Sequence, residues 1–459
     1  MTTALGFDIG TTHLKWQLVD RASGALLQEG SLDISPRVDP PLSEQTVGRI
    51  MDAVQATIDA AQRLGPLSHV AFSAAMHSLI AVDANGSPLT NSLTWMDTRA
   101  ETIARDLAQQ GVARTIRRTT GVPLHPMSPW VKWLWLRPRL PAKARPVALK
   151  DWIIQALTGT WVEDYSTAAA SGFLGLDYQW NPEMLTMAGL QPGDLPPLED
   201  LAYEVPARTG RYRIVVGGHD AALAHLHLGI LPGSTRALIS LGTSGALRVA
   251  TDAPLDSPDL FCYGMGPQRG YLVGAAFSNV GNILAWLAQI TQASVPTLLA
   301  EGIHSIRTHR TLPFVIPYWY GERFPWWRGD LNGEWRDLKP QHGRGDLAGS
   351  LIMAILAGFW YAAQRLDQES LSIRELIGGS GLLDFAPLAQ VVADALNRPL
   401  LTLAHADASL AGAVDLARGL GHQDRERARM TFRSYEPQDS SMAERVRHAW
   451  ERLRTAVTG

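Results

Sequence analysis

One short pattern, an apolar run that ends in Gly-Thr, occurs twice in this chain, half a chain apart. The first copy is LGFDIGTT at residues 5–12, and the second is ALISLGTS at residues 237–244. In both copies an apolar alternation follows the turn, which predicts a β-hairpin. Gly10 and Gly242 are separated by 232 residues in a chain of 459, and this spacing indicates an internal duplication. We therefore predict two similar α/β domains with a cleft between them.

Each predicted turn is suited to bind phosphate. Glycine lets the backbone bend tightly and approach a ligand, and the neighbouring hydroxyl and N–H groups donate to phosphate oxygens. Two such turns suit a polyphosphate such as ATP. Asp8 stands in the first copy where Ser240 stands in the second, so the first copy is predicted to hold Mg²⁺ through its water shell. The residues expected to contact the nucleotide are Thr11, Thr12, Lys15, Gly242 and Thr243 in the turns, and Gly379 and Ser380 in the glycine-rich segment 377–381.

The composition excludes several other classes of protein. A formal net charge of -3 and a pI near 6.5 argue against a nucleic-acid partner, so a small molecule becomes the expected ligand. Cys262 is the single cysteine, which excludes an internal disulfide, and it is expected to be buried. The first residues lack the basic region of a secretion signal, so we expect a cytoplasmic protein. The uncharged run 347–363 is of marginal length for a membrane span and is predicted to be a buried helix.

Apolar patterns along the chain alternate between strands and helices, which favours α/β domains. In the first half, strands are expected within 4–19, 69–73 and 213–217, and helices within 47–64 and 99–110. The second half repeats that style and ends in an amphipathic helix at 442–454. A helix end followed by Pro232-Gly233 marks the boundary. We predict an N-terminal domain of residues 1–232 and a C-terminal domain of residues 233–459.

Asp220 is the strongest candidate for a catalytic base. It follows an apolar run and two glycines, Gly217 and Gly218, and it precedes the helical stretch 221–228. Aspartate at a helix start also caps the helix, and that structural role is the alternative. The glycines favour a functional role because they leave space for a substrate beside the carboxylate. In phosphoryl transfer such a base orients and deprotonates the accepting hydroxyl.

Polar side chains follow two further predicted strands, at the edge where ligands bind in α/β sheets. His77 follows the strand 69–73 and is able to donate to substrate hydroxyls, with a satisfied core histidine as the alternative. Arg99 and Lys132 are candidates to bind an anionic substrate, with an ordinary solvated position as the alternative. The predicted substrate-contacting residues are Met76, His77, Trp95, Asp97, Arg99, Lys132 and Asp220.

The chain resembles the FGGY carbohydrate kinases, within the larger group that shares the actin and hexokinase (ribonuclease H-like) fold. The resemblance covers nearly the whole length, and its most specific parts are the paired hairpins, the glycine-Asp220 junction, the segment 321–323 before Pro325, and the segment 378–381. Within that family the segments 73–78, 95–99 and 120–129 are most similar to gluconate kinases, with xylulose kinases next. One departure is His219-Asp220-Ala221, where gluconate kinases tend to have Ser-Asp-Gly.

This resemblance implies an ATP-dependent kinase that phosphorylates a sugar or sugar acid, with D-gluconate to 6-phospho-D-gluconate as the leading reaction. Xylulose or another pentulose or polyol is the alternative substrate. The resemblance also implies that Asp220 is the catalytic base, that Asp8 serves Mg²⁺, that His77 contacts the sugar, and that the protein forms a homodimer. An alternative of another class is a non-catalytic sensor of nucleotide or sugar. The intact Asp220 argues against a sensor, which need not keep a base at that point.

Overall fold

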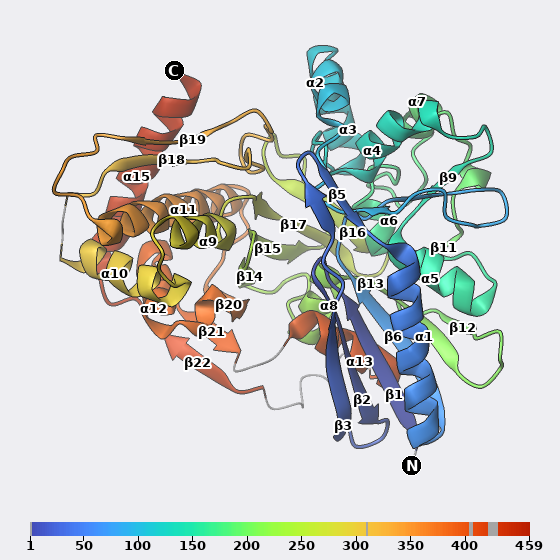
Figure 1. Ribbon diagram of the computed structural model, residues 1–459. Helices are drawn as coiled ribbons and strands as arrows, with labels where there is room; N and C mark the ends of the chain where they lie inside the picture. The colour runs from blue at the N-terminus through green and yellow to red at the C-terminus, as the bar shows by residue number, and fades with distance from the viewer. Residues whose placement is uncertain (1, 309–310, 404–406, 421–429) are drawn as a thin grey trace. The chain divides into compact units, whose positions relative to one another are not determined.

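The computed structural model describes residues 2–308, 311–403, 407–420 and 430–459. Contacts within the chain divide it into two compact units, each built on a β-sheet with packed helices (Figure 1). Unit 1 is Met1–Pro232, Thr251–Leu272 and Asp407–Ala428, and unit 2 is Gly233–Ala250, Val273–Ala406 and Arg429–Gly459. The first break between the units coincides with the predicted boundary. Two later segments of the predicted second domain, 251–272 and 407–428, belong to unit 1.

The sheet of unit 1 has six strands in the order β12-β13-β6-β1-β2-β3. β1 and β2 form the first predicted hairpin, in which Asp8 lies opposite Lys15. β6 is parallel to β1, and β13 is parallel to β6, so the C-terminal ends of these three strands meet at one edge of the sheet, where ligands bind in such folds. The strands are β1 (Thr3–Ile9), β2 (His13–Asp20), β3 (Leu26–Asp33), β6 (Leu67–Ala74), β12 (Glu204–Pro206) and β13 (Arg213–His219).

Helices cover both faces of this sheet. Side chains of a strand alternate between its two faces: Phe7 joins the apolar cluster that contains α1 (Val47–Leu64), whereas Ala4 joins the cluster that contains α8 (Asp220–His227) and α13 (Ala408–Arg418). In Figure 1 the red α13, from the C-terminal part of the chain, lies beside the blue strands β1 and β2. Gly6 allows this close approach, since a Cβ at that position would lie 2.6 Å from Val414 of α13.

The remainder of unit 1 is a helical layer whose apolar cluster contains the buried Trp130 and Trp133. The predicted buried cysteine, Cys262, lies in β16 (Phe261–Gly266), which packs against α6 (Tyr165–Ala169), and its burial is confirmed. The other helices are α2 (Glu101–Gln109), α3 (Val112–Thr120), α4 (Pro129–Leu136), α5 (Leu149–Thr158) and α7 (Pro182–Ala188). The short strands are β4 (Arg37–Asp39), β5 (Leu42–Gln45), β7 (Ile80–Val82), β8 (Ser92–Leu93), β9 (Arg145–Val147), β10 (Glu163–Asp164) and β11 (Leu198–Glu199).

The sheet of unit 2 repeats the strand arrangement of unit 1. Its strands follow one another in the order β17-β15-β14-β20-β21-β22, which matches β3-β2-β1-β6-β13-β12. β14 and β15 form the second predicted hairpin, and β14, β20 and β21 are mutually parallel, as β1, β6 and β13 are. The prediction of two similar α/β domains is therefore confirmed. The matched strands of this sheet are β14 (Arg236–Leu241), β15 (Gly245–Thr251), β17 (Gly270–Phe277), β20 (Glu375–Gly381), β21 (Leu400–Leu403) and β22 (Phe432–Tyr435). A separate two-stranded sheet consists of β18 (Phe314–Pro317) and β19 (Gly333–Arg336).

The helices of unit 2 include the apolar run that was considered as a membrane span. Among the described residues, α11 (Arg344–Gln368) is long and apolar enough to cross a membrane. The bent pair of α9 (Gly281–Ile290) and α10 (Val295–Arg307) passes the same test if it is taken as one span. However, 78% of the apolar window of α11 is buried within the protein. α10 and α15 pack against α11, so the prediction of a buried helix is confirmed. The other helices are α9 (Gly281–Ile290), α10 (Val295–Arg307), α12 (Ala386–Leu396) and α15 (Ser440–Thr458).

Candidate active site

The turn of the first hairpin is held by side chains from two other segments. The N–H of Gly10 donates to the carbonyl of His13 at 2.9 Å and closes the turn. Gln45 Nε2 donates to the carbonyls of Gly10 (3.0 Å) and Thr11 (2.8 Å), and the indole N–H of Trp95 donates to Thr11 Oγ1 at 3.1 Å. Trp95, a predicted sugar contact, thus lies against a predicted phosphate contact. Gln45 was not among the predicted site residues, because nothing in its local sequence pattern indicates this role.

Asp8 is a buried carboxyl group at the end of β1. Its side chain accepts a hydrogen bond from the hydroxyl of Ser73 at 2.6 Å, and the residue is 7% exposed. The pKa of Asp8 is raised to about 7, mainly by burial and also by the charges of Asp407 and Asp220, which together outweigh the lowering effects of Ser73 and Lys15. The carboxyl groups of Asp407 and Asp220 therefore both act on Asp8 at this edge of unit 1, and a cation there would stabilise the three groups.

A magnesium ion fits the chemistry of this edge but would need additional ligands. Carboxylate oxygens are hard donors of the kind that Mg²⁺ prefers, and the ion normally keeps several waters and binds substrate phosphates. Among the residues that the structure describes, no three His, Cys, Asp or Glu side chains are close enough to hold a metal ion by themselves. Asp8 would therefore share the ion with water and phosphate oxygens rather than enclose it.

Lys15, on the second strand of the hairpin, forms an ion pair with a residue almost 400 positions away. Its Nζ lies 2.6 Å from Asp407 Oδ2, and Asp407 also caps the N-terminus of α13. Burial raises the pKa of Asp407, but the hydrogen bonds from Lys15 and Ser409 outweigh it, so the pKa is lowered. The ammonium group of Lys15 also acts on Asp8 electrostatically and lowers the pKa of that carboxyl group. No sequence signal near Asp407 indicates this contact.

Asp220 is the first residue of α8, directly after β13, as predicted. Its Oδ1 accepts a hydrogen bond from the N–H of Ala221 at 2.8 Å, and its side chain is 43% exposed. Gly217 and Gly218, which precede Asp220, do not leave the space for a substrate that was predicted. A Cβ at Gly217 would overlap the carbonyl oxygen of Phe72, and a Cβ at Gly218 would lie 2.7 Å from Ser166 Oγ, so the protein itself fills the room that was assigned to a substrate.

The segment after β6 presents His77 in a strained backbone conformation. His77 has a φ of 66°, its Nδ1 lies 2.9 Å from the carbonyl oxygen of Ala170, and its ring meets Tyr263 edge-on at 5.7 Å. Non-glycine residues with positive φ often occur at functional sites. A cavity adjoins this segment, and its polar lining includes His77, Ser78, Glu163, Thr167 and Ser171. Met76 also lines the cavity.

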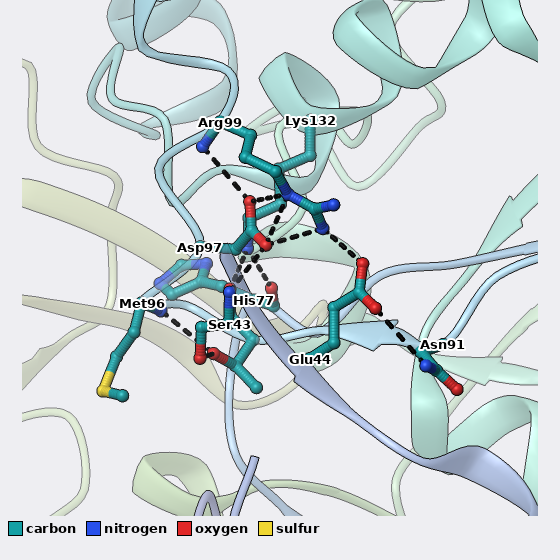
Figure 2. A network of polar contacts seen from close by, with 9 residues as sticks. Ser43, Glu44, His77, Asn91, Met96, Asp97, Arg99 and Lys132 are labelled. Atoms are coloured by element: carbon teal, nitrogen blue, oxygen red, sulfur yellow. Dashed lines mark hydrogen bonds and ion pairs between the residues drawn. The ribbon is translucent and has the colours of Figure 1, made fainter. Parts of the chain in front are cut away.

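Lys132 is fully buried beneath the same segment (Figure 2). Its Nζ donates to the carbonyl oxygen of His77 at 2.9 Å and to that of Thr94 at 2.6 Å, which ties the two predicted sugar-binding segments together. Burial lowers the pKa of Lys132 to about 7. The structure therefore places Lys132 as a support for His77, with its donors directed at backbone carbonyls.

Arg99 belongs to a network of charged groups that also contains Asp97 (Figure 2). Its guanidinium group lies 2.7 Å from Asp97 Oδ2 and 2.5 Å from Glu44 Oε1, and it stacks over the ring of Trp135. Asp97 is fully buried and also accepts the N–H of Ser43 at 3.0 Å. Arg99 thus has two carboxylate partners in the protein, and together these contacts connect the segment of Trp95 to strand β5.

In unit 2 the second hairpin turn lies at the N-terminus of α9. The carbonyl oxygens of Gly242 and Thr243 accept the N–H groups of Gly281 (2.9 Å) and Asn282 (3.1 Å). The predicted adenosine segment lies on the adjacent strand, because β20 is parallel to β14 and a Cβ at Gly381 would lie 2.7 Å from the carbonyl of Leu241. The space beside Gly379 is open, since an added Cβ would meet no atom within 4 Å. The side chain of Ser380, the other predicted contact, lies outside what the structure describes.

Comparisons with known proteins agree with this geometry. Residues 3–224 match the family model for the FGGY family of carbohydrate kinases, N-terminal domain, and residues 237–418 match that for the C-terminal domain. A gluconokinase from Bacillus subtilis (strain 168) is 30% identical over 390 residues, which cover 78% of this chain and 74% of the relative.

Two solved structures from Lactobacillus acidophilus are also similar, each with 27% sequence identity and a TM-score of 0.90. One is a ligand-bound xylulose kinase, with 100% of this chain and 99% of that chain covered. The other is a gluconate kinase, with 99% of this chain and 98% of that chain covered.

Proposed function

This chain belongs to the FGGY family of carbohydrate kinases, and from that premise we propose that it transfers the γ-phosphate of Mg-ATP to a hydroxyl group of D-gluconate. The observation that carries the proposal is the position of Asp220 at the N-terminus of α8, within the electrostatic field of Asp8 and in the unit that contains the first phosphate turn. A carboxylate at this place is available to accept a proton near a bound phosphate.

The proposed reaction requires few covalent steps from the protein. Asp220 accepts the proton of the substrate hydroxyl while the hydroxyl oxygen bonds to the γ-phosphorus and the bond to ADP breaks. Thr11, Thr12 and Lys15 donate to the transferred group, and the turn at Gly242 and Thr243 binds the other phosphates. Gly379 and Ser380 lie along the adenosine. Mg²⁺ at Asp8, when bound, would supply positive charge to the phosphates.

The sugar side of the proposed site comprises Met76, His77, Trp95, Asp97 and Arg99, with Lys132 beneath them. The cavity beside His77 supports a substrate position at that segment. The hydrogen bond between Trp95 and Thr11 supports the assignment of Trp95, because it brings this side chain next to the first phosphate turn. D-gluconate is favoured over other acceptors by the gluconokinase relative that is 30% identical. Xylulose is the second candidate, supported by the similarity to the xylulose kinase structure. We place the reaction in the cytoplasm, where Mg-ATP is supplied.

Coupled ADP release tests the proposal directly. The full-length protein is assayed with Mg-ATP and a panel of D-gluconate, D-xylulose, L-ribulose and glycerol. Asp220→Asn keeps the side-chain shape but removes the base, so turnover is expected to fall at least ~100-fold while ATP binding is retained. Asp52→Asn, which changes an exposed carboxylate on α1, is the matched control.

The panel separates the candidate functions. Turnover with gluconate that disappears in Asp220→Asn supports both the kinase and its substrate. Turnover with a neutral sugar alone would reject gluconate, and near-normal kcat in Asp220→Asn would reject the assigned base. Nucleotide binding without turnover on any acceptor would favour a sensor.

The role of Asp8 has a separate test. Asp8→Asn removes one negative charge from the group of three carboxyl groups, so the concentration of Mg²⁺ needed for half-maximal activity is expected to rise at least ~10-fold. An unchanged Mg²⁺ titration would reject Asp8 as the metal-binding residue.

A further inference from the structure

The residue before the proposed base supplies an unusual helix cap. The first N–H groups of a helix need acceptors from outside the helix. In α8 the N–H of Ala222 donates to Nδ1 of His219 at 3.0 Å, and His219 has the extended backbone of an N-cap residue, with φ −72° and ψ 155°. N-caps are usually Ser, Thr, Asp or Asn, whose short side chains carry the acceptor. Nδ1 of histidine occupies the position that Oδ1 of an asparagine would have, so the ring accepts the same capping hydrogen bond.

His219 is held from two sides. Its backbone N–H lies 3.3 Å from Ser166 Oγ, and that hydroxyl donates to the carboxylate of Asp164, which caps α6. Its ring is 1% exposed and bonds to α8. His219 therefore connects the start of α6 to the start of α8, and it fixes the direction in which the chain enters Asp220.

The hydrogen bond also defines the protonation of the ring. Because Nδ1 accepts from a backbone N–H, its lone pair is in use and the proton of the neutral ring lies on Nε2. A second proton on Nδ1 would remove the acceptor and add positive charge at the positive end of the helix dipole. Asp220 Oδ1, 3.9 Å from Nδ1, therefore faces a neutral ring while the cap is in place.

We propose that His219 is a positioning residue for the phosphoryl transfer, and that its Nδ1 cap fixes the first turn of α8 so that the Asp220 carboxylate points at the accepting hydroxyl. This inference rests on the proposed function of Asp220. A general base must lie within hydrogen-bond reach of the proton it accepts. A misplacement of ~1 Å is enough to cost ~100-fold in rate.

The test uses three variants of the full chain, His219→Ala, His219→Asn and His219→Gln. Asparagine places an oxygen at the position of Nδ1, whereas glutamine places its polar group near the position of Nε2. We expect kcat to fall at least ~10-fold in the Ala and Gln variants and to stay within ~3-fold of the wild type in the Asn variant. The KM for ATP should stay unchanged in all three. Hydrogen exchange at the Ala222 amide should accelerate in the Ala and Gln variants only.

Each other outcome overturns the inference. A normal kcat in His219→Ala means that the cap does not position the base. An equal loss in the Asn and Gln variants means that the ring acts through something other than Nδ1. If His219→Ala does not fold, the Asn and Gln pair still decides. Failure of the proposed function is distinguishable, because it appears as normal turnover in Asp220→Asn, whereas exchange at Ala222 reports the cap without any turnover.

Discussion

Replacing Lys132 with methionine tests whether this buried amine has a structural role or binds the substrate. Methionine has similar length but no charge and no donor. In the native protein the Nζ of Lys132 is fully buried and donates to the carbonyl oxygens of His77 and Thr94. The variant therefore removes a costly buried charge and, at the same time, leaves two buried carbonyl groups without this donor.

The structure gives the size and sign of the effect. Burial lowers the pKa of Lys132 from 10.5 to about 7, and because one pKa unit corresponds to ~1.4 kcal/mol, the charged form costs the native state roughly 5 kcal/mol at low pH. Unfolded lysine keeps its proton up to pH 10.5, whereas the native lysine keeps it only up to pH 7. The unfolded state thus binds more protons in this range, so wild-type stability rises with pH between about 7 and about 10.5. Lys132→Met has no such rise.

The two effects oppose each other at neutral pH. Each carbonyl that loses its donor costs about 1–3 kcal/mol, so at pH 7 the variant and the wild type should have similar free energies of unfolding. At pH 9.5 the native lysine is neutral, so the substitution no longer removes a large penalty for a buried charge. Relative to the wild type, the variant should therefore be less stable by ~3 kcal/mol more than at pH 7.

Urea unfolding followed by tryptophan fluorescence at pH 7, 8 and 9.5 measures this difference. Lys143→Met, which changes an exposed lysine, should differ from the wild type by a constant amount. The explanation fails if the difference between Lys132→Met and the wild type varies by less than ~1 kcal/mol over this range. Kinetics then separates the two roles: support of His77 predicts a higher KM for every sugar, whereas recognition of a carboxylate predicts a loss for gluconate alone.

Two further predictions concern other parts of unit 1. Asp407→Asn removes the ion pair with Lys15. In assays of coupled ADP release, it should raise the KM for ATP several-fold with little change in the KM for the sugar. An unchanged KM for ATP would show that the ion pair does not contribute to nucleotide binding. Gly217→Ala should lower the free energy of unfolding by ~2 kcal/mol more than Gly210→Ala, measured by urea unfolding, because both glycines have positive φ but only at Gly217 would a Cβ overlap the backbone of Phe72. Equal losses in the two variants would contradict the overlap.

The elements that the sequence predicts well are those whose signal is local. Helix α1 spans Val47–Leu64, as predicted, because its buried residues recur every three or four positions. Both hairpins are confirmed, since each is specified by a glycine turn between two apolar runs. Strand β20 (Glu375–Gly381) contains the glycine-rich segment 377–381, and no local signal indicates that these glycines are extended. Pairing with β14 holds those glycines extended, and that neighbour is over 100 residues away.

The candidate site was harder to predict because most of its partners are distant in sequence. Arg99 and Lys132 were candidates to bind an anionic substrate on the basis of charge alone. Arg99 does pair with Asp97, two residues away, but its second carboxylate partner, Glu44, is 55 residues away. Thr94, an acceptor for Lys132, is 38 residues away, and no local pattern reveals either distant partner. A basic side chain near a ligand site often stabilises the local backbone instead of binding the ligand. Only the burial of its donor groups distinguishes the structural role from ligand binding.

The glycines before Asp220 have a structural role that differs from the predicted one. Gly217 and Gly218 were interpreted as room for a substrate, but their missing side chains admit Phe72 of β6 and Ser166 of α6 instead. This packing brings β13 against its neighbours and begins α8 at the edge where β1 and β6 end. The glycines therefore serve Asp220 indirectly: they determine where the helix starts, and the helix start determines where the carboxylate lies. It follows that substitutions at Gly217 should reduce stability and turnover together. At His219, only substitutions that remove the cap, such as His219→Ala and His219→Gln, should reduce turnover, and their loss of stability should be no more than about 1 kcal/mol.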